Sequence, residues 1–223
     1  MKKYFILSIL AGAFIALGRA AAMAVGGMTG SKLLASVVFA SALSLCVMAG
    51  SALFTGECLK QSPETMKASQ PISRGMKSQG ICWLGNMVGS WAVLAAYLIT
   101  GVAPAVLKYT IGVSVAKAAE TPAHCLFLAI LCNICVCAAV WRCIKMQSEA
   151  GKLIMIFWCL LIFMVYGYEH SVANMSIIGL AVLNGAVPAH SYLGNLALVT
   201  IGNAIGGICC IAWSYYTATI KAG

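Results

Sequence analysis

The sequence predicts an all-α polytopic membrane protein with six transmembrane helices, arranged as two inverted repeats of three in one domain over residues 1–223. Three observations support this fold class. Of the 223 residues, 62% are apolar and only 9% are charged, whereas soluble domains contain about 25% charged residues. Six apolar stretches each approach the ~20 residues that a helix needs to cross a bilayer. A short motif also recurs at a fixed distance and divides the chain into repeats at 1–110 and 111–223.

The six predicted helices are apolar stretches separated by short connections. We expect them at Tyr4–Val25, Leu33–Phe54, Gln79–Val102, Cys125–Ile144, Leu153–Val187 and Leu193–Trp213. The first stretch follows Lys2 and Lys3, and in this respect it also resembles a cleavable signal peptide. Its length, and the presence of Arg19 beside the small residues that would form the cleavage site, favour a helix that is retained.

The second and fifth predicted helices are expected to be broken. The second stretch runs into a polar segment, Thr55–Lys67, and the fifth is too long for one straight crossing and contains Glu169 and His170. Polar residues thus interrupt two of the apolar runs. In inverted-repeat transport folds, the path is lined where a helix in each half is broken.

The distribution of positive charge predicts that both termini lie in the cytoplasm. With that orientation, three basic residues lie outside (Lys32, Lys108 and Lys117), and Arg19 in the outer part of the first helix is expected to snorkel to the membrane boundary. The cytoplasmic set is Lys2, Lys3, Lys60, Lys67, Arg74, Lys77, Arg142, Lys145, Lys152 and Lys221. Such an excess of Lys and Arg is typical of cytoplasmic loops.

Charge and cysteine content exclude several other classes. The formal charge of +9 does not indicate a nucleic-acid partner, because the basic residues are scattered and form no basic cluster. Cys132, Cys135 and Cys137 lack a second cysteine pair and a nearby histidine other than His124, so we expect no metal and no cofactor. With three histidines, no aspartate and no HExxH motif, the sequence also argues against a membrane enzyme.

An internal repeat connects the two halves of the chain. A Gly-Asn-x-x-Gly motif begins at Gly85 in the third stretch and again at Gly202 in the sixth, 117 residues later (202 − 85). The same shift places Gly50 on Gly167. Because each copy holds an odd number of spans, the second copy must cross the membrane upside down, a plan in which the transport path follows the repeat interface. We expect the two breaks just after Gly50 and Gly167.

Three polar residues at these breaks are candidates for function, and Lys117 lies between the third and fourth stretches. An ionisable residue at membrane depth is a functional candidate by default, and His170 is the type whose charge can change near neutral pH; its alternative role is a buried histidine satisfied by neighbouring Asn and Ser. Glu169 either faces the path or holds helix ends through backbone N–H groups. Thr55 either donates a hydrogen bond to a substrate or caps a helix. Taken alone, Lys117 is predicted to be an ordinary loop lysine.

The same residues carry a family resemblance that covers essentially the whole chain. Four segments resemble the formate/nitrite transporter family of bacterial anion channels: Leu53–Gly56, Ile130–Trp141, Gly167–Met175 and Ile201–Gly207. The most specific of them reads Gly-Tyr-Glu-His-Ser-Val-Ala-Asn-Met. The resemblance implies an aquaporin-like protomer in the bacterial cytoplasmic membrane and a homopentamer in which each protomer has its own pore.

The resemblance also assigns roles to individual positions. It makes His170 the central pore histidine, Thr55 the threonine opposite it, and Lys117 a buried lysine near that histidine, which replaces the loop interpretation. It places Asn133 and Asn174 near the path. The constrictions implied are Phe39 and Phe163 on the outer side, Leu43, Leu53 and Val136 on the inner side, and Phe54 on the loop. The N-terminus is shorter than in many members, and Glu57 adds an acidic residue near the inner mouth.

The implied function is a channel or transporter for small monovalent anions of weak acids, such as formate, nitrite or hydrosulfide. An anion must lose water to cross apolar rings, which is costly. A buried cation can attract it, and a histidine can hydrogen-bond or protonate it, so that a neutral acid crosses with its proton. Acetate or lactate is the alternative substrate class. A channel for neutral solutes is less favoured, since paired Asn-Pro-Ala motifs are missing.

Overall fold

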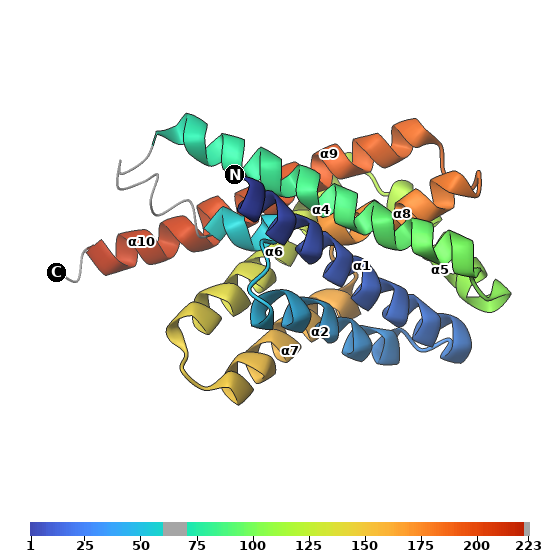
Figure 1. The fold of residues 1–223 in the computed structure, drawn as a ribbon, viewed down its shortest axis with the longest axis horizontal. Coiled ribbons are helices and arrows are strands. Elements are labelled where there is room, and N and C mark those ends of the chain that lie inside the picture. The colour runs from blue at the N-terminus through green and yellow to red at the C-terminus, as the bar shows by residue number, and fades with distance from the viewer. Residues whose placement is uncertain (60–70, 221–223) are drawn as a thin grey trace.

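The computed structural model describes residues 1–59 and 71–220, and over these residues the chain forms helices joined by turns and short loops (Figure 1). The helices are α1 (Lys2–Thr29), α2 (Lys32–Met48), α4 (Ile72–Thr100), α5 (Pro104–Ala118), α6 (Pro122–Lys145), α7 (Glu149–Tyr166), α8 (Ser171–Leu183), α9 (Ala189–Ile205), the π-helix η1 (Gly206–Ala212) and α10 (Trp213–Ile220). Lys60, Lys67 and Lys221 of the predicted cytoplasmic set, and most of Thr55–Lys67, lie outside the described residues.

Length and composition allow five of the described helices to cross a membrane. They are Lys2–Thr29, Ser73–Thr100, Pro122–Lys145, Glu149–Tyr166 and Ala189–Ala218. The helix α1 packs against α4 and α2, and α6 packs against α9 and α7 (Figure 1). Many large apolar side chains on the outer surface are exposed, among them Ile99, Phe127 and Trp158. An outer surface of this kind suits lipid rather than water.

Both predicted breaks are present at the expected positions. The helix α2 ends at Met48, residues 49–53 are not helical, and residues 54–59 are helical again. In the second half, α7 ends at Tyr166 and α8 begins at Ser171. Gly50 has φ 65° and Gly167 has φ 86°, values that glycine adopts without a Cβ clash. A left-handed glycine is therefore what ends each first half-helix.

Asn86 of α4 holds the first break in place. Its side-chain Oδ1 accepts a hydrogen bond from the Phe54 N–H at 2.9 Å, and its Nδ2 donates to the Ala52 carbonyl at 3.0 Å and to the Ser8 carbonyl at 2.7 Å. Groups left unpaired at the broken helix thus find partners in one buried amide. This amide ties the break to α1 as well as to α4.

Asn203 of α9 holds the second break in the same way. Its Oδ1 accepts from the Ser171 N–H at 2.9 Å, and its Nδ2 donates to the Glu169 carbonyl at 2.9 Å and to the Ala129 carbonyl at 2.8 Å. Asn203, Ser171 and Glu169 are the 117-residue equivalents of Asn86, Phe54 and Ala52. The recurring motif therefore has a structural cause, because its asparagine satisfies the backbone of a broken helix.

The glycines of the motif let neighbouring backbones approach closely. A Cβ on Gly89 would lie 1.9 Å from the Ile9 carbonyl oxygen of α1, and a Cβ on Gly206 would lie 2.3 Å from the Ile130 carbonyl oxygen of α6. Small residues serve the same purpose at helix contacts within membranes. The helices that carry the motif thus approach their neighbours closely in both halves, α4 against α1 and η1 against α6.

One helix was not expected from the apolar stretches. Residues treated as a connection form α5, which begins with Pro104 at its first position, where a fixed φ favours a helix start. It packs on α1 and α8, and the Ser114 hydroxyl donates to the Ile177 carbonyl at 2.9 Å. Lys117 lies in the last turn of α5 and is buried, so the interpretation as a loop lysine, which its neighbours alone suggested and the family resemblance had replaced, is wrong. The physical reason is that two glycines of α1, at positions 26 and 27, let this short helix approach closely.

Candidate functional site

The two broken helices meet at Thr55 and His170. Thr55 Oγ1 lies 3.1 Å from His170 Nε2, and both side chains are buried. His170 is the N-cap of α8, where its Nδ1 accepts a hydrogen bond from the Ala173 N–H at 3.1 Å. A neutral imidazole that accepts at Nδ1 carries its proton on Nε2. The ring therefore donates toward Thr55, and the Thr55 hydroxyl keeps its own hydrogen for another acceptor.

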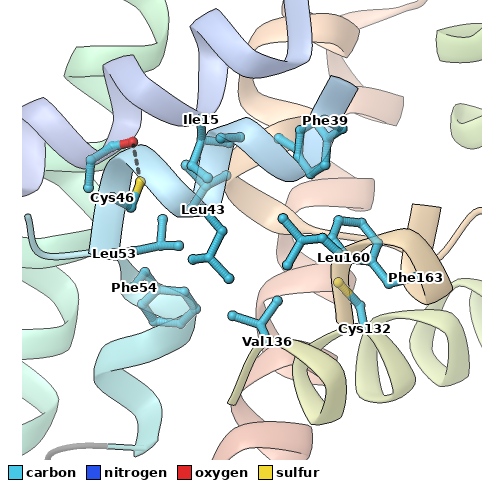
Figure 2. Packing of buried hydrophobic residues seen from close by; sticks show 14 of the residues in the cluster. Ile15, Phe39, Leu43, Cys46, Leu53, Phe54, Cys132, Val136, Leu160 and Phe163 are labelled. Atoms are coloured by element: carbon cyan, nitrogen blue, oxygen red, sulfur yellow. Dashed lines mark hydrogen bonds between the residues drawn. The ribbon is translucent and has the colours of Figure 1, made fainter. Parts of the chain in front are cut away.

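Apolar side chains surround this polar pair. Phe39 and Phe163 meet edge to face with ring centroids 5.5 Å apart, and Phe163 stacks on the His170 ring at 6.1 Å. Figure 2 shows Leu43, Leu53, Phe54 and Val136 pointing toward one another from α2, the first break and α6. All six predicted constriction residues (Phe39, Leu43, Leu53, Phe54, Val136 and Phe163) are buried in one cluster. Leu160 of α7, which the sequence did not single out, is buried in the same cluster (Figure 2).

A buried ionic network lies next to the histidine. Lys117 Nζ forms an ion pair with Glu169 Oε1 and lies 3.4 Å from the Tyr168 carbonyl. Asn174 Nδ2 donates to Glu169 Oε2 at 2.5 Å and to Asn195 Oδ1 at 2.9 Å. The Glu169 carboxylate is thus held by side chains rather than by the N–H groups of a helix end. Its partners are those that a buried charge requires.

Asn133 holds the backbone of the first break rather than the histidine itself. Its Nδ2 donates to the Thr55 carbonyl at 3.2 Å and to the Asn203 carbonyl at 2.5 Å. Cys137 Sγ is 3.2 Å from the same Thr55 carbonyl. Asn133 therefore links the Thr55 segment directly to the helix that fixes His170.

The sequence reasoning did not select Asn86, Asn203 or Asn195 as site residues. The first two were visible as the asparagines of the repeated motif, so a search for equivalent amides would have found them. Asn195 gave no such signal, because it is a single amide in an apolar stretch. Its contacts with Asn174, Lys117 and Cys125 depend on how α9 packs.

Two cavities approach the site from opposite directions. The Arg19 cavity has a volume of about 390 Å³, and residues that line it include Arg19, Lys32, Lys117, Glu120 and His124. The Lys152 cavity has a volume of about 350 Å³, and residues that line it include Leu43, Leu53, Gly56, Glu149 and Lys152. Neither cavity is lined by Thr55, His170, Phe39 or Phe163. The buried site therefore lies between the residues that line the two cavities.

The Arg19 cavity combines several charges. Glu120 lies between α5 and α6, and its Oε2 is 3.9 Å from His124 Nδ1. Burial raises the pKa of the Glu120 carboxyl above its usual value, and the charge of Glu169 adds to this effect. Lys117 reaches the same cavity with its side chain 10% exposed, whereas the Glu169 side chain is fully buried. The cationic end of the pair thus faces the cavity.

Arg19 differs from the sequence expectation. It was expected to snorkel to the membrane boundary, but it is only 4% exposed and lies inside the helix bundle. Its Nη1 is 3.0 Å from Met164 Sδ, and its Cζ lies 5.5 Å from the centroid of the Phe39 ring. The attraction of a guanidinium for an aromatic face explains the inward position.

Glu57, expected near the inner mouth, is held by a hydrogen bond inside the protein. The Tyr4 hydroxyl of α1 donates to Glu57 Oε2 at 3.2 Å, and Glu57 is buried. This contact joins the helical segment 54–59 to the N-terminal helix.

These features define a class of protein. A helical membrane protein in which two interrupted helices meet at a buried polar pair, with a cavity on either side, has the organisation of a membrane transport protein.

The comparisons with known proteins give the family. Residues 1–217 match the family described as Formate/nitrite transporter, and the chain belongs to this family. The chain is similar to the nitrite transporter NirC of Escherichia coli (strain K12), with 36% identity over 98% of this chain and 84% of that protein. It is also similar to a probable formate transporter of Methanothermobacter thermautotrophicus, with 33% identity over 96% of this chain and 89% of that protein.

Solved structures show the same fold. A structure described as an FNT family ion channel superimposes with a TM-score of 0.90 and 31% identity, covering 97% of this chain and 90% of that chain. A pentameric formate channel with formate bound superimposes with a TM-score of 0.83 and 25% identity, covering 98% and 97%. The all-helical architecture of the chain is therefore that of known channels.

Proposed function

We propose that the chain is a transmembrane channel or transporter for small monovalent anions of weak acids, with formate, nitrite and hydrosulfide as the substrate class. The observation that carries this proposal is the 3.1 Å contact between Thr55 and His170, which brings two hydrogen-bonding side chains from two broken helices to one buried point. The relatives named as nitrite and formate transporters support the substrate class. His170, Thr55, Lys117, Asn133, Asn174 and Glu169 form the proposed site.

The proposed architecture is an aquaporin-like inverted repeat with six crossings, divided into 1–110 and 111–223. The equivalent hydrogen bonds of Asn86 and Asn203, 117 residues apart, support the repeat. The helix α5 lies across the proposed boundary. Both termini are proposed to be cytoplasmic, which places the Arg19 cavity outside and the Lys152 cavity inside. A homopentamer in the bacterial cytoplasmic membrane is proposed from the similar pentameric formate channel.

The energetics of anion passage assign a part to each feature. The Phe39–Phe163 pair and the Leu43, Leu53 and Val136 side chains remove water from the anion, and an unpaired charge in such surroundings is costly. Lys117 lowers that cost because its ammonium group faces the cavity while its counter-ion is buried behind it. Anions are thereby drawn toward the site, and cations are disfavoured.

At the centre, His170 and Thr55 supply donors for the anion. When the anion enters, it displaces the contact between the two side chains, and the Nε2–H and the Thr55 hydroxyl each replace one hydrogen bond that water had provided. In the proton-coupled step, the ring takes up a second proton from the entry side at Nδ1 and gives its Nε2 proton to the anion, which leaves a neutral ring with its proton on Nδ1. The neutral acid crosses the apolar side chains and releases its proton on the other side, and uptake of a proton at Nε2 with loss of the Nδ1 proton restores the starting ring. Protonated Nδ1 cannot accept from the Ala173 N–H, so the cap of α8 must open during this step.

The test is anion flux into proteoliposomes with the internal pH recorded. Formate, nitrite and hydrosulfide are compared with acetate, lactate and glycerol, for the native chain and for His170→Asn. Asparagine keeps an N-cap acceptor but cannot carry the proton. We expect anion flux with matching proton movement in the native chain and loss of that coupling in the variant. Flux without any proton movement would contradict coupling, and passage of glycerol alone would favour a neutral-solute channel.

A further inference from the structure

We infer that Arg19 forms a binding site for a planar anion with two oxygens in the Arg19 cavity, and that this site makes the chain prefer formate-like or nitrite-like anions to hydrosulfide. The inference rests on the proposed function for the identity of the anions. It adds a binding and specificity-determining residue in α1, in front of the Phe39–Phe163 pair, that is separate from the Thr55–His170 pair.

The first observation is that Arg19 has a charge without a counter-ion in the described chain. Its Nε is buried and makes no hydrogen bond. Among the described residues, the hydrogen-bond partner of its Nη1 is the thioether sulfur of Met164, which is a weak acceptor. No carboxylate of the described residues lies within ion-pair distance of the guanidinium, and Glu169 is already paired with Lys117. A buried charge in this state is costly unless something outside the chain pairs with it.

The second observation is the way Arg19 is held. The Phe39 ring lies against the guanidinium at 5.5 Å, and Met164 Sδ occupies one of its nitrogens. These contacts restrict a long side chain that would otherwise lose much rotamer freedom on binding. The unpaired Nε belongs to a planar group whose N–H donors match two oxygens at once. A group held in this way is prepared for an anion with two oxygens, and less so for a single-atom centre such as hydrosulfide.

The third observation is the position of Arg19 at the cavity. Arg19 lines the Arg19 cavity together with Lys32 and Lys117. The cavity volume of about 390 Å³ exceeds what an anion of three non-hydrogen atoms needs. The Phe39 ring that Arg19 contacts is one half of the edge-to-face pair that leads to His170. An anion bound at Arg19 therefore lies next to the Phe39–Phe163 pair, on the side of the Arg19 cavity. Lys117 reaches the same cavity and adds to the positive potential there.

The experiment compares Arg19→Gln and Arg19→Lys with a matched control, Lys32→Gln, which removes one positive charge from the same cavity. Flux of formate, nitrite and hydrosulfide is measured in right-side-out membrane vesicles as a function of external concentration. In parallel, thermal unfolding of the purified protein in detergent is followed with sodium formate, sodium hydrosulfide or sodium chloride at equal ionic strength.

For Arg19→Gln we expect the half-saturating concentration of formate and nitrite to rise about tenfold, the order expected for one charge-assisted hydrogen bond, with a smaller rise for hydrosulfide. Arg19→Lys keeps the charge but loses the planar fork, so hydrosulfide affinity should stay near the native value while formate affinity falls. Lys32→Gln should weaken all three anions equally and only slightly. Formate should raise the unfolding temperature of the native protein above its value in chloride, and Arg19→Gln should abolish that rise.

Two results would overturn the inference. One is native formate and nitrite half-saturation in Arg19→Gln, and the other is an equal loss for all three anions in both Arg19 variants. If Arg19→Gln does not fold, the test is the ratio of the half-saturating concentrations of formate and hydrosulfide in Arg19→Lys. A ratio equal to the native one overturns the inference. If the native chain carries no anion but still shows the formate-dependent unfolding shift that Arg19→Gln lacks, the Arg19 site stands and the proposed function fails. If the native chain carries the anions but neither Arg19 variant changes the half-saturating concentrations or the unfolding shift, the proposed function stands and the Arg19 site fails.

Discussion

Thr55 Oγ1 and His170 Nε2 lie 3.1 Å apart, although 115 residues separate them in the chain. Each side chain stands at the start of the second half of a broken helix, and each of those starts is fixed by an equivalent asparagine. The polar pair is therefore the product of two similar local structures, which a third amide, Asn133, connects.

Substitution of His170 separates its capping role from its proposed proton role. His170→Asn keeps an acceptor for the Ala173 N–H and should leave stability within about 0.5 kcal/mol of the native value, whereas His170→Ala should lose about 1 kcal/mol because the N-cap acceptor is gone. Thermal unfolding in detergent measures this difference. Equal stability of the two variants would show that the cap contributes nothing.

The asparagines of the two breaks should be equally important for stability. Asn86→Ala and Asn203→Ala each remove an amide that makes three buried hydrogen bonds, and each should destabilise the protein by about 2–4 kcal/mol. Asn184→Ala is the matched control, since its amide bonds only to a carbonyl of its own helix. A loss in the control as large as in the other two would contradict the assignment.

The Lys117–Glu169 pair should respond differently to single and double substitution. Lys117→Met leaves a buried carboxylate and Glu169→Gln leaves a buried ammonium group, so each should cost about 3–5 kcal/mol of stability. The double variant should recover most of that stability, because no unpaired charge remains. Its anion flux should nevertheless stay low, since the Lys117 ammonium group that faces the Arg19 cavity is missing. Full recovery of flux would remove Lys117 from the proposed mechanism.

The raised pKa of Glu120 predicts that anion entry depends on pH. Burial raises the pKa of its carboxyl, so it becomes neutral at a higher pH than an exposed glutamate. Above that pKa its negative charge opposes anions in the Arg19 cavity, and below it the opposition disappears. Glu120→Gln should therefore carry more anion than the native chain at neutral pH, and the two should converge as pH falls. A constant flux ratio between pH 4 and 7, roughly the range around a carboxyl pKa, would refute this role.

Close helix packing predicts a strong effect of one added methyl group. Gly89→Ala would place a Cβ 1.9 Å from the Ile9 carbonyl oxygen, so α1 and α4 must separate. We expect a loss of about 1–3 kcal/mol, the range for overpacking. Gly112→Ala in α5 is the control, because a Cβ there meets nothing within 4 Å. It should be neutral or stabilising, since alanine favours a helix over glycine.

Much of the fold could be predicted because it depends on local sequence. Apolar composition determined that the chain belongs in a membrane. Gly50 and Gly167 ended their helices through the backbone freedom of glycine, and the 117-residue shift identified the repeated motif. The depth of Glu169 and His170 in an apolar stretch marked the second break, because charged groups are costly there. These features act within a few residues of one another.

Tertiary structure decided which side chains are buried and which of them pair. The apolar stretches gave no sign of α5, since this short helix has no clear amphipathic periodicity. Judged from its neighbours in the sequence, Lys117 was an ordinary loop lysine, and only the family resemblance implied a buried one. Packing places it against Glu169, 52 residues away. Arg19 seemed suited to the membrane boundary, yet the Phe39 ring and Met164 hold it inside. Composition and spacing set where helices start, stop and enter the membrane. Which side chains pair inside depends on how the helices pack against one another.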